Sequence, residues 1–298
     1  MGHVDYKITI FEYGSGAIPE TMQYSNQYTS NRDYNVFAIA LLQGGGKNIL
    51  VDTGMDLDDP VKQGLAKNFL DYCHSPQEML ATVGLTPDDI DDVVLTHSHF
   101  DHMGALEVYP NAQFYLQRDD LEAWEDIASD PKKALLMFMS VDAEDLKRAR
   151  ALEAEGRLTL LDGDVADLLP GIDVIKTSSA HSFADQLVVI RTPDGPYVDA
   201  GDVATRQGNI LGVEEKPFYL PPAMGNAAPY GAMKAYDEIM AIVGDDISKV
   251  ILPHDSYRAD RMPYDEPKEG LKVYQLRKLG ALVGRLPWRG VLPADCCG

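Results

Sequence analysis

Short runs of hydrophobic residues, rich in Val, Ile and Leu, recur along the chain and are bounded by Gly, Pro, Asp or Asn. Most of these runs have the length of a β-strand and are too short for helices. The predicted strands cover Ile8–Tyr13, Val36–Leu42, Asn48–Val51, Val93–Thr96, Gln113–Leu116, Leu158–Leu161, Asp173–Thr177, Leu187–Arg191, Tyr197–Ala200 and Val250–Leu252. Turn residues at Gly44–Gly46 and Pro193–Gly195 predict that the second and third strands, and the eighth and ninth, form β-hairpins.

Helical patterns lie between these groups of strands. Thr86 is followed by a proline and two aspartates, which is typical of the start of a short helix. Further helices are predicted over Asp119–Ser129, Ala143–Glu155, Gly231–Val243 and about 268–284. The segment Arg206–Pro229 is rich in Gly and Pro and lacks a helical period, so it is expected to form a long functional loop.

This grouping of strands and helices favours two mixed β-sheets covered by helices. The strand Ile49–Val51 runs into Asp52-Thr53-Gly54, and the strand that begins at Tyr197 runs into Asp199-Ala200-Gly201. Both are the second strand of a predicted hairpin, as a duplicated half-domain would produce. We therefore expect a single α/β domain over 1–298, with a helical insertion at about 117–156 and a C-terminal helix at about 268–284.

The charge balance excludes some classes of function. The chain has 26 Lys and Arg against 47 Asp and Glu, which gives a net charge of −21. Such an acidic surface repels phosphate backbones and anionic lipids, so neither a nucleic acid nor a membrane is expected as a partner. There is no hydrophobic run of the ~20 residues that a membrane span needs, no pattern typical of a secretory signal, and too few cysteines for a disulfide framework. A cytoplasmic location is expected.

Potential metal ligands are concentrated directly after one predicted strand. The segment reads Thr96-His97-Ser98-His99-Phe100-Asp101-His102. In extended chain, His97 and His99 lie on one face, and the following turn can present Asp101 and His102 from a second direction. Histidines and acids packed so densely would repel or desolvate one another without a cation. The segment therefore predicts two ligands for one divalent ion and two for a neighbouring ion.

The remaining candidate ligands also follow predicted strands. His181 comes after the strand Asp173–Thr177, Asp202 after the strand that begins at Tyr197, and His254 after Val250–Leu252. Five of the seven histidines thus lie beyond strand ends, where α/β folds collect their functional residues. His3 and His74 are given no role.

With these residues in place, the sequence resembles the metallo-β-lactamase-fold superfamily. Thr96–His102 matches the family's T-H-x-H-x-D-H segment, and Ala180-His181-Ser182, Gly201-Asp202 and Pro253-His254-Asp255 stand where its later ligands are expected. The likeness covers about 36–256. It implies an αββα sandwich of two mixed sheets with a dinuclear metal site at one edge.

The resemblance also implies a distribution of the ligands. One ion would take His97, His99 and His181, and the other would take Asp101, His102 and His254, with Asp202 between them. Asp52 would orient a ligand imidazole. Two divalent ions, most simply zinc, with Mn, Fe or Co as alternatives, would lower the pKa of a shared water, and the resulting hydroxide would attack a substrate carbonyl. Asp101 and Asp202 are accordingly the candidate catalytic carboxylates.

Within the superfamily, the chain is most similar to the N-acyl-homoserine lactonase-like group, through Phe100 and the Pro253-His254-Asp255 segment. A tyrosine usually found three residues after the bridging aspartate is replaced here by Thr205, which is therefore a further candidate catalytic residue. We expect the loop that follows to line the substrate pocket, with Tyr219 or Tyr230 supplying the missing phenol. The alternative, which is equally compatible with the sequence, is that these rings only pack the loop against the rest of the protein. The expected substrate is a small lactone or related ester.

Three other functions remain open from the sequence. A glyoxalase-II-like thioesterase would use the same ligands plus basic residues near the C-terminus, such as Lys268, Lys272, Arg277 and Lys278. A phosphodiesterase of this fold is disfavoured because no Lys/Arg cluster accompanies the net charge. A non-enzymatic metal-binding protein is disfavoured because all seven ligand positions are filled. The helices over 119–156, which contain Trp124 and Phe138, are compatible with a cover over the site or a homodimer interface, whereas any single one of these side chains is more typical of core packing.

Overall fold

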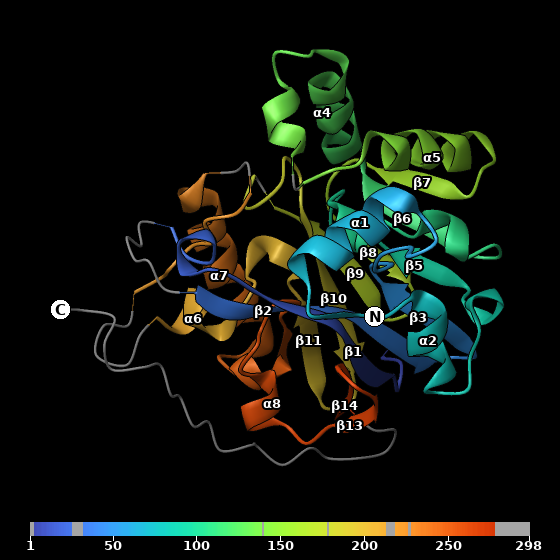
Figure 1. Ribbon diagram of the computed structural model, residues 1–298. Coiled ribbons are helices and arrows are strands. Elements are labelled where there is room, and N and C mark those ends of the chain that lie inside the picture. The colour runs from blue at the N-terminus through green and yellow to red at the C-terminus, as the bar shows by residue number, and fades with distance from the viewer. Residues whose placement is uncertain are drawn as a thin grey trace.

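A computed structural model describes residues 3–25, 32–138, 140–177, 179–212, 218–225 and 228–277. Two β-sheets lie at the centre, with helix α7 (Pro229–Val243) on one side and helices α1 (Pro60–Phe69) and α2 (Pro76–Ala81) on the other (Figure 1). Helices α4 (Arg118–Ser129) and α5 (Ala143–Ala154) lie at one end of the molecule. The remaining helices are α3 (Phe100–Met103), α6 (Gln207–Leu211), α8 (Arg258–Arg261) and the short 3-10 helices η1 (Glu20–Met22), η2 (Pro87–Asp89), η3 (Leu106–Val108), η4 (Ala134–Met137), η5 (Gly201–Val203) and η6 (Ile247–Lys249).

The larger sheet has the strand order β13-β14-β1-β2-β3-β5-β6-β7, with β4 paired to β1. Its strands are β1 (Lys7–Pro19), β2 (Arg32–Gly44), β3 (Lys47–Val51), β4 (Tyr72–Cys73), β5 (Asp92–Val94), β6 (Gln113–Gln117), β7 (Leu158–Leu161), β13 (Asp265–Lys268) and β14 (Leu271–Arg277). The smaller sheet has the order β12-β11-β10-β9-β8. Its strands are β8 (Val165–Leu169), β9 (Ile172–Lys176), β10 (Gln186–Thr192), β11 (Gly195–Asp199) and β12 (Val250–Ile251).

The two sheets share one pattern of strand pairing. Strands β2 and β3 form an antiparallel hairpin, as do β10 and β11, so both predicted hairpins are confirmed. The second strand of each hairpin pairs on its other side with a parallel strand, β3 with β5 and β11 with β12. The echo between the two strand ends in the sequence therefore corresponds to equivalent positions in the two sheets.

The hydrophobic core is divided by the sheets into separate layers. Ala40 and Leu42 of β2 pack between the two sheets with residues such as Val188, whereas Leu41 faces the opposite side with Trp124 and other helical residues. A third cluster joins α7 to the outer face of the smaller sheet. This alternation along β2, with one face on each layer, is what a strand covered on both sides requires. The predicted αββα arrangement of two mixed sheets flanked by helices is confirmed.

The prediction of a helix over about 268–284 is wrong for its described part. Residues Leu271–Arg277 form strand β14, which pairs antiparallel with β1, and residues 278–298 lie outside the described residues. Leu271 and Val273 pack in one hydrophobic layer and Tyr274 and Leu276 in the other, which is the two-residue alternation of a strand covered on both faces. Pairing with β1 outweighs the helix propensity of Leu, Lys, Gln and Arg in this segment.

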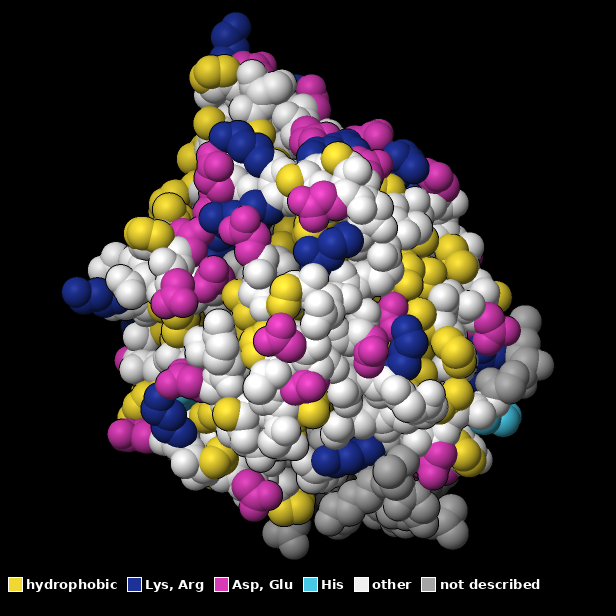
Figure 2. Space-filling model, turned by 90° about the vertical axis from the view of Figure 1, so that its right-hand side faces the viewer, with side chains coloured by type: hydrophobic (Ala, Val, Ile, Leu, Met, Phe, Trp, Pro, Cys, Tyr) yellow, Lys and Arg dark blue, Asp and Glu magenta, His cyan; other side chains and the backbone are white. Residues whose placement is uncertain are grey.

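Three further features bear on function. The segment expected to be a loop over Arg206–Pro229 begins with the short helix α6, and its residues 213–217, 226 and 227 lie outside the described residues. Within the described part of the chain, no helix has the length and apolar character needed to cross a bilayer. On the face shown in Figure 2, Lys and Arg side chains lie among Asp and Glu side chains rather than in a separate basic patch.

Candidate metal centre

The histidine-rich segment leaves the larger sheet at the end of β5. The chain stays extended through His99, which occupies the N-cap position of α3, and Asp101 and His102 lie in that helix. All four of its candidate ligands are buried, with exposed fractions of 7% or less. The change from extended chain to helix turns Asp101 and His102 away from the direction set by His97 and His99.

The other three candidate ligands come from the smaller sheet. His181 lies in the loop between β9 and β10, Asp202 lies in η5 just after β11, and His254 follows β12. Each is 3% exposed or less. The structure therefore brings together seven side chains from two sheets, in two groups.

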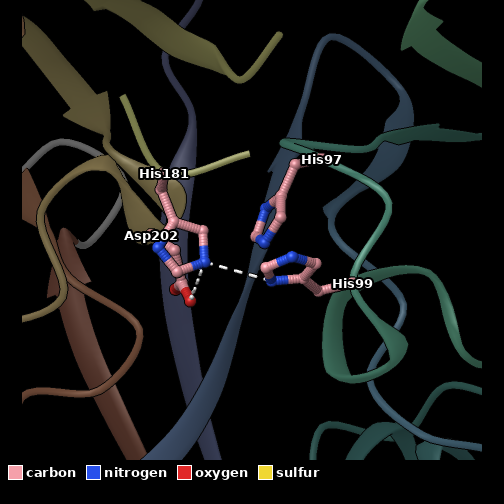
Figure 3. A group of neighbouring side chains, drawn as sticks. All are labelled: His97, His99, His181 and Asp202. Atoms are coloured by element: carbon pink, nitrogen blue, oxygen red, sulfur yellow. Dashed lines mark hydrogen bonds and ion pairs between the residues drawn. The ribbon is translucent and has the colours of Figure 1, made fainter. Parts of the chain in front are cut away.

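The first group contains His97, His99, His181 and Asp202, and one ligand atom from each lies within 4.8 Å of the others. Figure 3 shows the three imidazoles converging from opposite sides, with His99 Nδ1 3.0 Å from His181 Nε2. His181 Nε2 also lies 3.2 Å from Asp202 Oδ2. Two imidazole nitrogens that face one another at this distance can share a cation between their lone pairs.

The second group contains Asp101, His102 and His254, again with one ligand atom from each within 4.8 Å of the others. Asp101 Oδ2 lies 3.4 Å from His102 Nε2 and 3.5 Å from His254 Nε2. Asp202 Oδ1 lies 3.3 Å and 3.0 Å from the same two nitrogens. Asp202 Oδ2 lies 3.2 Å from His181 Nε2 of the first group and also 3.2 Å from His254 Nε2 of the second, so the Asp202 carboxylate contacts both groups.

The electrostatics of the first group suit a cation. Burial, together with the neighbouring His181, lowers the pKa of His99 to about 3, and burial among His102 and His99 also lowers the pKa of His97 well below its usual range. Both imidazoles are therefore neutral at pH 7, with lone pairs available for coordination. His97 Nε2 is buried without a hydrogen-bond partner among the described residues.

In the second group, the charge of the carboxylates has a larger effect on the pKa of His102 than burial has. Burial lowers the pKa of His102, but Asp101 and Asp202 outweigh it and raise that pKa well above its usual range. Burial raises the pKa of Asp202, but His254, His102 and His181 outweigh it and hold that pKa well below its usual range. His102 Nε2 and Asp202 Oδ1 are buried and have no hydrogen-bond partner among the described residues. Nitrogen and oxygen donors of this kind fit zinc or a similar divalent ion.

Hydrogen bonds on the outer side of two imidazoles fix the nitrogen that points inward. His102 Nδ1 donates to Asp52 Oδ2 at 2.7 Å, and His254 Nδ1 donates to the Val36 carbonyl at 2.6 Å. The other oxygen of Asp52 accepts from the backbone N–H of Thr96 at 2.7 Å. Both histidines therefore present Nε2 to the centre, which is the arrangement that metal-binding histidines need.

Two buried acids near the centre were not identified from the sequence. Asp120, in the first turn of α4, accepts hydrogen bonds from the loops that carry His99 and His181. Asp185 accepts from the backbone N–H of His181 at 3.0 Å. In the sequence, Asp120 looks like an ordinary acidic residue of a helix N-terminus, and Asp185 like a polar loop residue. No local signal distinguishes them, because their partners are distant along the chain.

Two of the residues predicted to contact substrate, Thr205 and Tyr219, have other partners. Thr205 Oγ1 donates to Asn209 Oδ1 at 2.9 Å, and the Thr205 carbonyl accepts from the backbone N–H of His254. Tyr219 donates to Asp237 Oδ1 at 2.5 Å, which holds it against α7. Tyr230 is 70% exposed in the first turn of α7. Tyr219 therefore fits the alternative interpretation, in which the loop aromatics pack rather than bind substrate.

The basic residues considered for a thioesterase are paired with acids. Lys272 Nζ lies 2.7 Å from Glu12 Oε1, Lys268 pairs with Glu78, and Arg277 Nε lies 2.5 Å from Asp194 Oδ1. Lys278 lies outside the described residues. The three described cations thus have carboxylate partners within this chain and do not form a free anion-binding set.

The helical segment over 117–156 combines buried and exposed aromatic residues. Trp124 of α4 is fully buried, and its ring centroid lies 5.5 Å from that of His99. Leu135 and Phe138, in and just after η4, are 84% and 72% exposed. The segment is attached to the candidate ligands through the N–H of Phe100, which donates to the Ser140 carbonyl at 2.9 Å.

Curated proteins with similar sequences include lactonases. N-acyl homoserine lactonase AiiB of Agrobacterium fabrum (strain C58 / ATCC 33970) is 29% identical over 141 residues, which are 46% of this chain and 49% of that protein. N-acyl homoserine lactonase AiiA of Bacillus thuringiensis subsp. kurstaki is 26% identical over 153 residues, which are 48% of this chain and 54% of that protein. The chain thus spans about half the length of these two relatives.

Solved structures show the same fold. One is an N-acyl homoserine lactone hydrolase with the product N-hexanoyl-L-homoserine at its catalytic metal centre, with a TM-score of 0.65, 19% identity and coverage of 90% of this chain and 99% of that one. A probable metal-dependent hydrolase from Staphylococcus aureus gives a TM-score of 0.66, with 19% identity and coverage of 95% and 100%. At these identities the likeness establishes the fold.

A family model decides the classification. The match runs over 33–254, which includes both hairpins and every candidate ligand from His97 to His254. It agrees with the αββα layers and with the resemblance expected from the Thr96–His102 segment. This chain belongs to the Metallo-beta-lactamase superfamily.

Proposed function

We propose that this protein is a metal-dependent hydrolase that opens a lactone or cleaves a related carboxylic ester. The proposal rests on the pair of buried ligand groups that meet at Asp202, whose carboxylate contacts His181 of one group and His254 of the other. Lactonases among the similar proteins support a lactone as the substrate class. The pairing of Lys268, Lys272 and Arg277 with acids gives no support to the thioesterase alternative.

Each residue of the centre has a proposed task. One divalent ion would be held by His97, His99 and His181. The other would be held by Asp101, His102 and His254, and Asp202 would bind both ions. When bound, such a pair of ions lowers the pKa of a water and polarises a carbonyl, which is the chemistry that ester hydrolysis needs. Zinc is the metal that this donor set fits best.

Hydrolysis also requires a side chain that transfers a proton and a surface that binds the substrate. Asp101 is proposed to pass a proton toward the departing oxygen, because its carboxylate lies beside both His102 and His254. The exposed Leu135 and Phe138, on the segment attached to Phe100, offer apolar surface to a substrate with a hydrocarbon chain. A cytoplasmic location and a homodimer stay predictions.

A substrate panel combined with metal analysis tests the proposal. Protein loaded with zinc is assayed against an N-acyl homoserine lactone, a simple γ-lactone, p-nitrophenyl acetate, S-acyl-glutathione and bis-p-nitrophenyl phosphate. We expect hydrolysis of a lactone or ester that a chelator abolishes and zinc restores, and that His99→Ala and Asp202→Ala remove. Asp58→Asn, at an exposed position, is the control. Turnover of the thioester or phosphodiester alone would reject the proposal.

A further inference from the structure

Asp120 is a fully buried carboxylate that joins two loops from different sheets. Its Oδ2 accepts from Ser98, from the backbone N–H at 2.9 Å and from Oγ at 2.6 Å. Its Oδ1 accepts from Ser182 Oγ at 2.6 Å and from the backbone N–H groups of Phe183 and Ala184, both at 3.0 Å. Five donors therefore converge on one side chain of α4.

The two loops are the ones that carry the three histidines of the first ligand group. Ser98 lies between His97 and His99, and Ser182 directly follows His181. Because each loop is bonded to a different oxygen of the same carboxylate, the distance between the loops is set by the width of that carboxylate. We infer that Asp120 is a positioning residue that holds His97 and His99 at coordinating distance from His181, and so sets the affinity for one of the two ions.

A second residue of α4 strengthens this attachment. Trp124 Nε1 donates to Ser182 Oγ at 2.9 Å, so the Ser182 hydroxyl accepts from Trp124 while it donates to Asp120. The Trp124 ring also packs edge-on against His99. Helix α4 thus contacts both loops through a hydrogen-bonded chain as well as through packing.

The second ligand group is held by different partners. His102 is oriented by Asp52 and His254 by the Val36 carbonyl, and no bond from Asp120 to either histidine occurs in the described part of the chain. A defect at Asp120 should therefore weaken the two ions unequally. This inference rests on the metal centre of the proposed function, but it concerns metal affinity and can be tested without a substrate.

The test is the metal affinity of Asp120→Asn, measured by competition with a chromophoric chelator and by native mass spectrometry of the zinc-loaded protein. An amide has one acceptor oxygen, so its NH₂ group must face the donors of one of the two loops. We expect one ion to bind as in the wild type and the other to bind 10- to 100-fold more weakly, as about 10–100-fold is typical of lost outer hydrogen bonds. Asp119→Asn is the matched control, because Asp119 precedes Asp120 in the same turn, is 62% exposed and pairs with Lys176.

Two results would overturn the inference. One is binding of both ions with wild-type affinity in folded Asp120→Asn. The other is equal weakening of both ions together with a lower unfolding midpoint of the metal-free protein, which indicates a general loss of stability. If Asp120→Asn does not fold, Ser98→Ala and Ser182→Ala each remove one donor and should weaken the same single ion; unchanged affinity in both variants refutes the inference. Wild-type protein that binds two ions but hydrolyses no lactone or ester would refute the proposed function alone.

Discussion

Replacing Asp52 by asparagine is expected to remove metal from the second ligand group selectively. The Asp52 carboxylate accepts from His102 Nδ1 at 2.7 Å, from the Thr96 backbone N–H at 2.7 Å and from the Thr96 hydroxyl, in a site with 3% exposure. Asparagine keeps the size of the side chain and changes one acceptor oxygen to a donor NH₂ group. Whichever way the amide turns, either the Nδ1–H group of His102 or the backbone N–H group of Thr96 then faces the NH₂ group, which cannot accept a hydrogen bond.

The cost can be worked out from those contacts. An unsatisfied buried donor costs about 1–3 kcal/mol. His102 can relieve it only by giving up the proton on Nδ1, which leaves its remaining proton on Nε2, the atom that faces Asp101 and Asp202 and would bind the ion. The cost is thereby transferred to metal binding, where about 1–3 kcal/mol corresponds to about 5- to 150-fold in affinity.

Isothermal titration of the metal-free protein with zinc measures both binding steps. Asp52→Asn should lose affinity in one step and retain the other, whereas Asp58→Asn, an exposed neighbour, should match the wild type. If both steps keep their wild-type constants in Asp52→Asn, then the hydrogen bond to His102 does not control its tautomer, and the reasoning is wrong.

Three other perturbations have defined outcomes. Lys62→Met should lower the free energy of unfolding by about 3–5 kcal/mol in urea denaturation, because fully buried Lys62 lies 2.9 Å from Asp145 and 3.1 Å from Asp59; a loss below 1 kcal/mol would contradict this. Burial raises the pKa of Asp59, but a backbone N–H and Lys62 outweigh it and lower that pKa to about 2. Its stabilisation is therefore present above the unfolded pKa of about 3.9 and is lost as pH falls toward 2, so thermal melts of Asp59→Asn should be less sensitive to acid over that window than those of the wild type. Gly225→Ala should reduce zinc content and hydrolysis, because its Cβ would come within 2.7 Å of His181 Nδ1 and within 2.6 Å of its carbonyl oxygen at a φ of +120°; wild-type values for both would show that the loop moves aside freely.

Strands and candidate ligands could be predicted from the sequence where they depend on a local pattern of residues. The strands were predictable because short Val-, Ile- and Leu-rich runs are bounded by turn residues, as at Gly44–Gly46. The candidate ligands were predictable because they directly follow such strands, as His97 follows the run that begins at Val93. Helices α1 and α2 were missed although Asp59-Pro60 and the Ser75–Glu78 capping box mark their starts.

Other features could not be predicted because they arise from contacts between distant segments. Strand β14 contains good helix formers and is a strand because β1 lies beside it. Asp120 acquires its role only when Ser182, 62 positions away, is brought to its carboxylate. Likewise, the hydrogen bond from Tyr219 to Asp237, which directs this phenol to α7, depends on how the loop packs against that helix.

The seven candidate ligands are shared between the two halves of the molecule, with His97, His99, Asp101 and His102 following β5 of the larger sheet and His181, Asp202 and His254 following strands of the smaller one. A cation in either group would therefore cross-link the sheets, and neither half alone would offer a complete coordination sphere. Each tenfold in affinity for the native state would then add about 1.4 kcal/mol against separation of the halves. The fraction of chain that stays folded should accordingly depend on the metal concentration around it. A low metal concentration would then limit the amount of folded protein as well as its turnover rate.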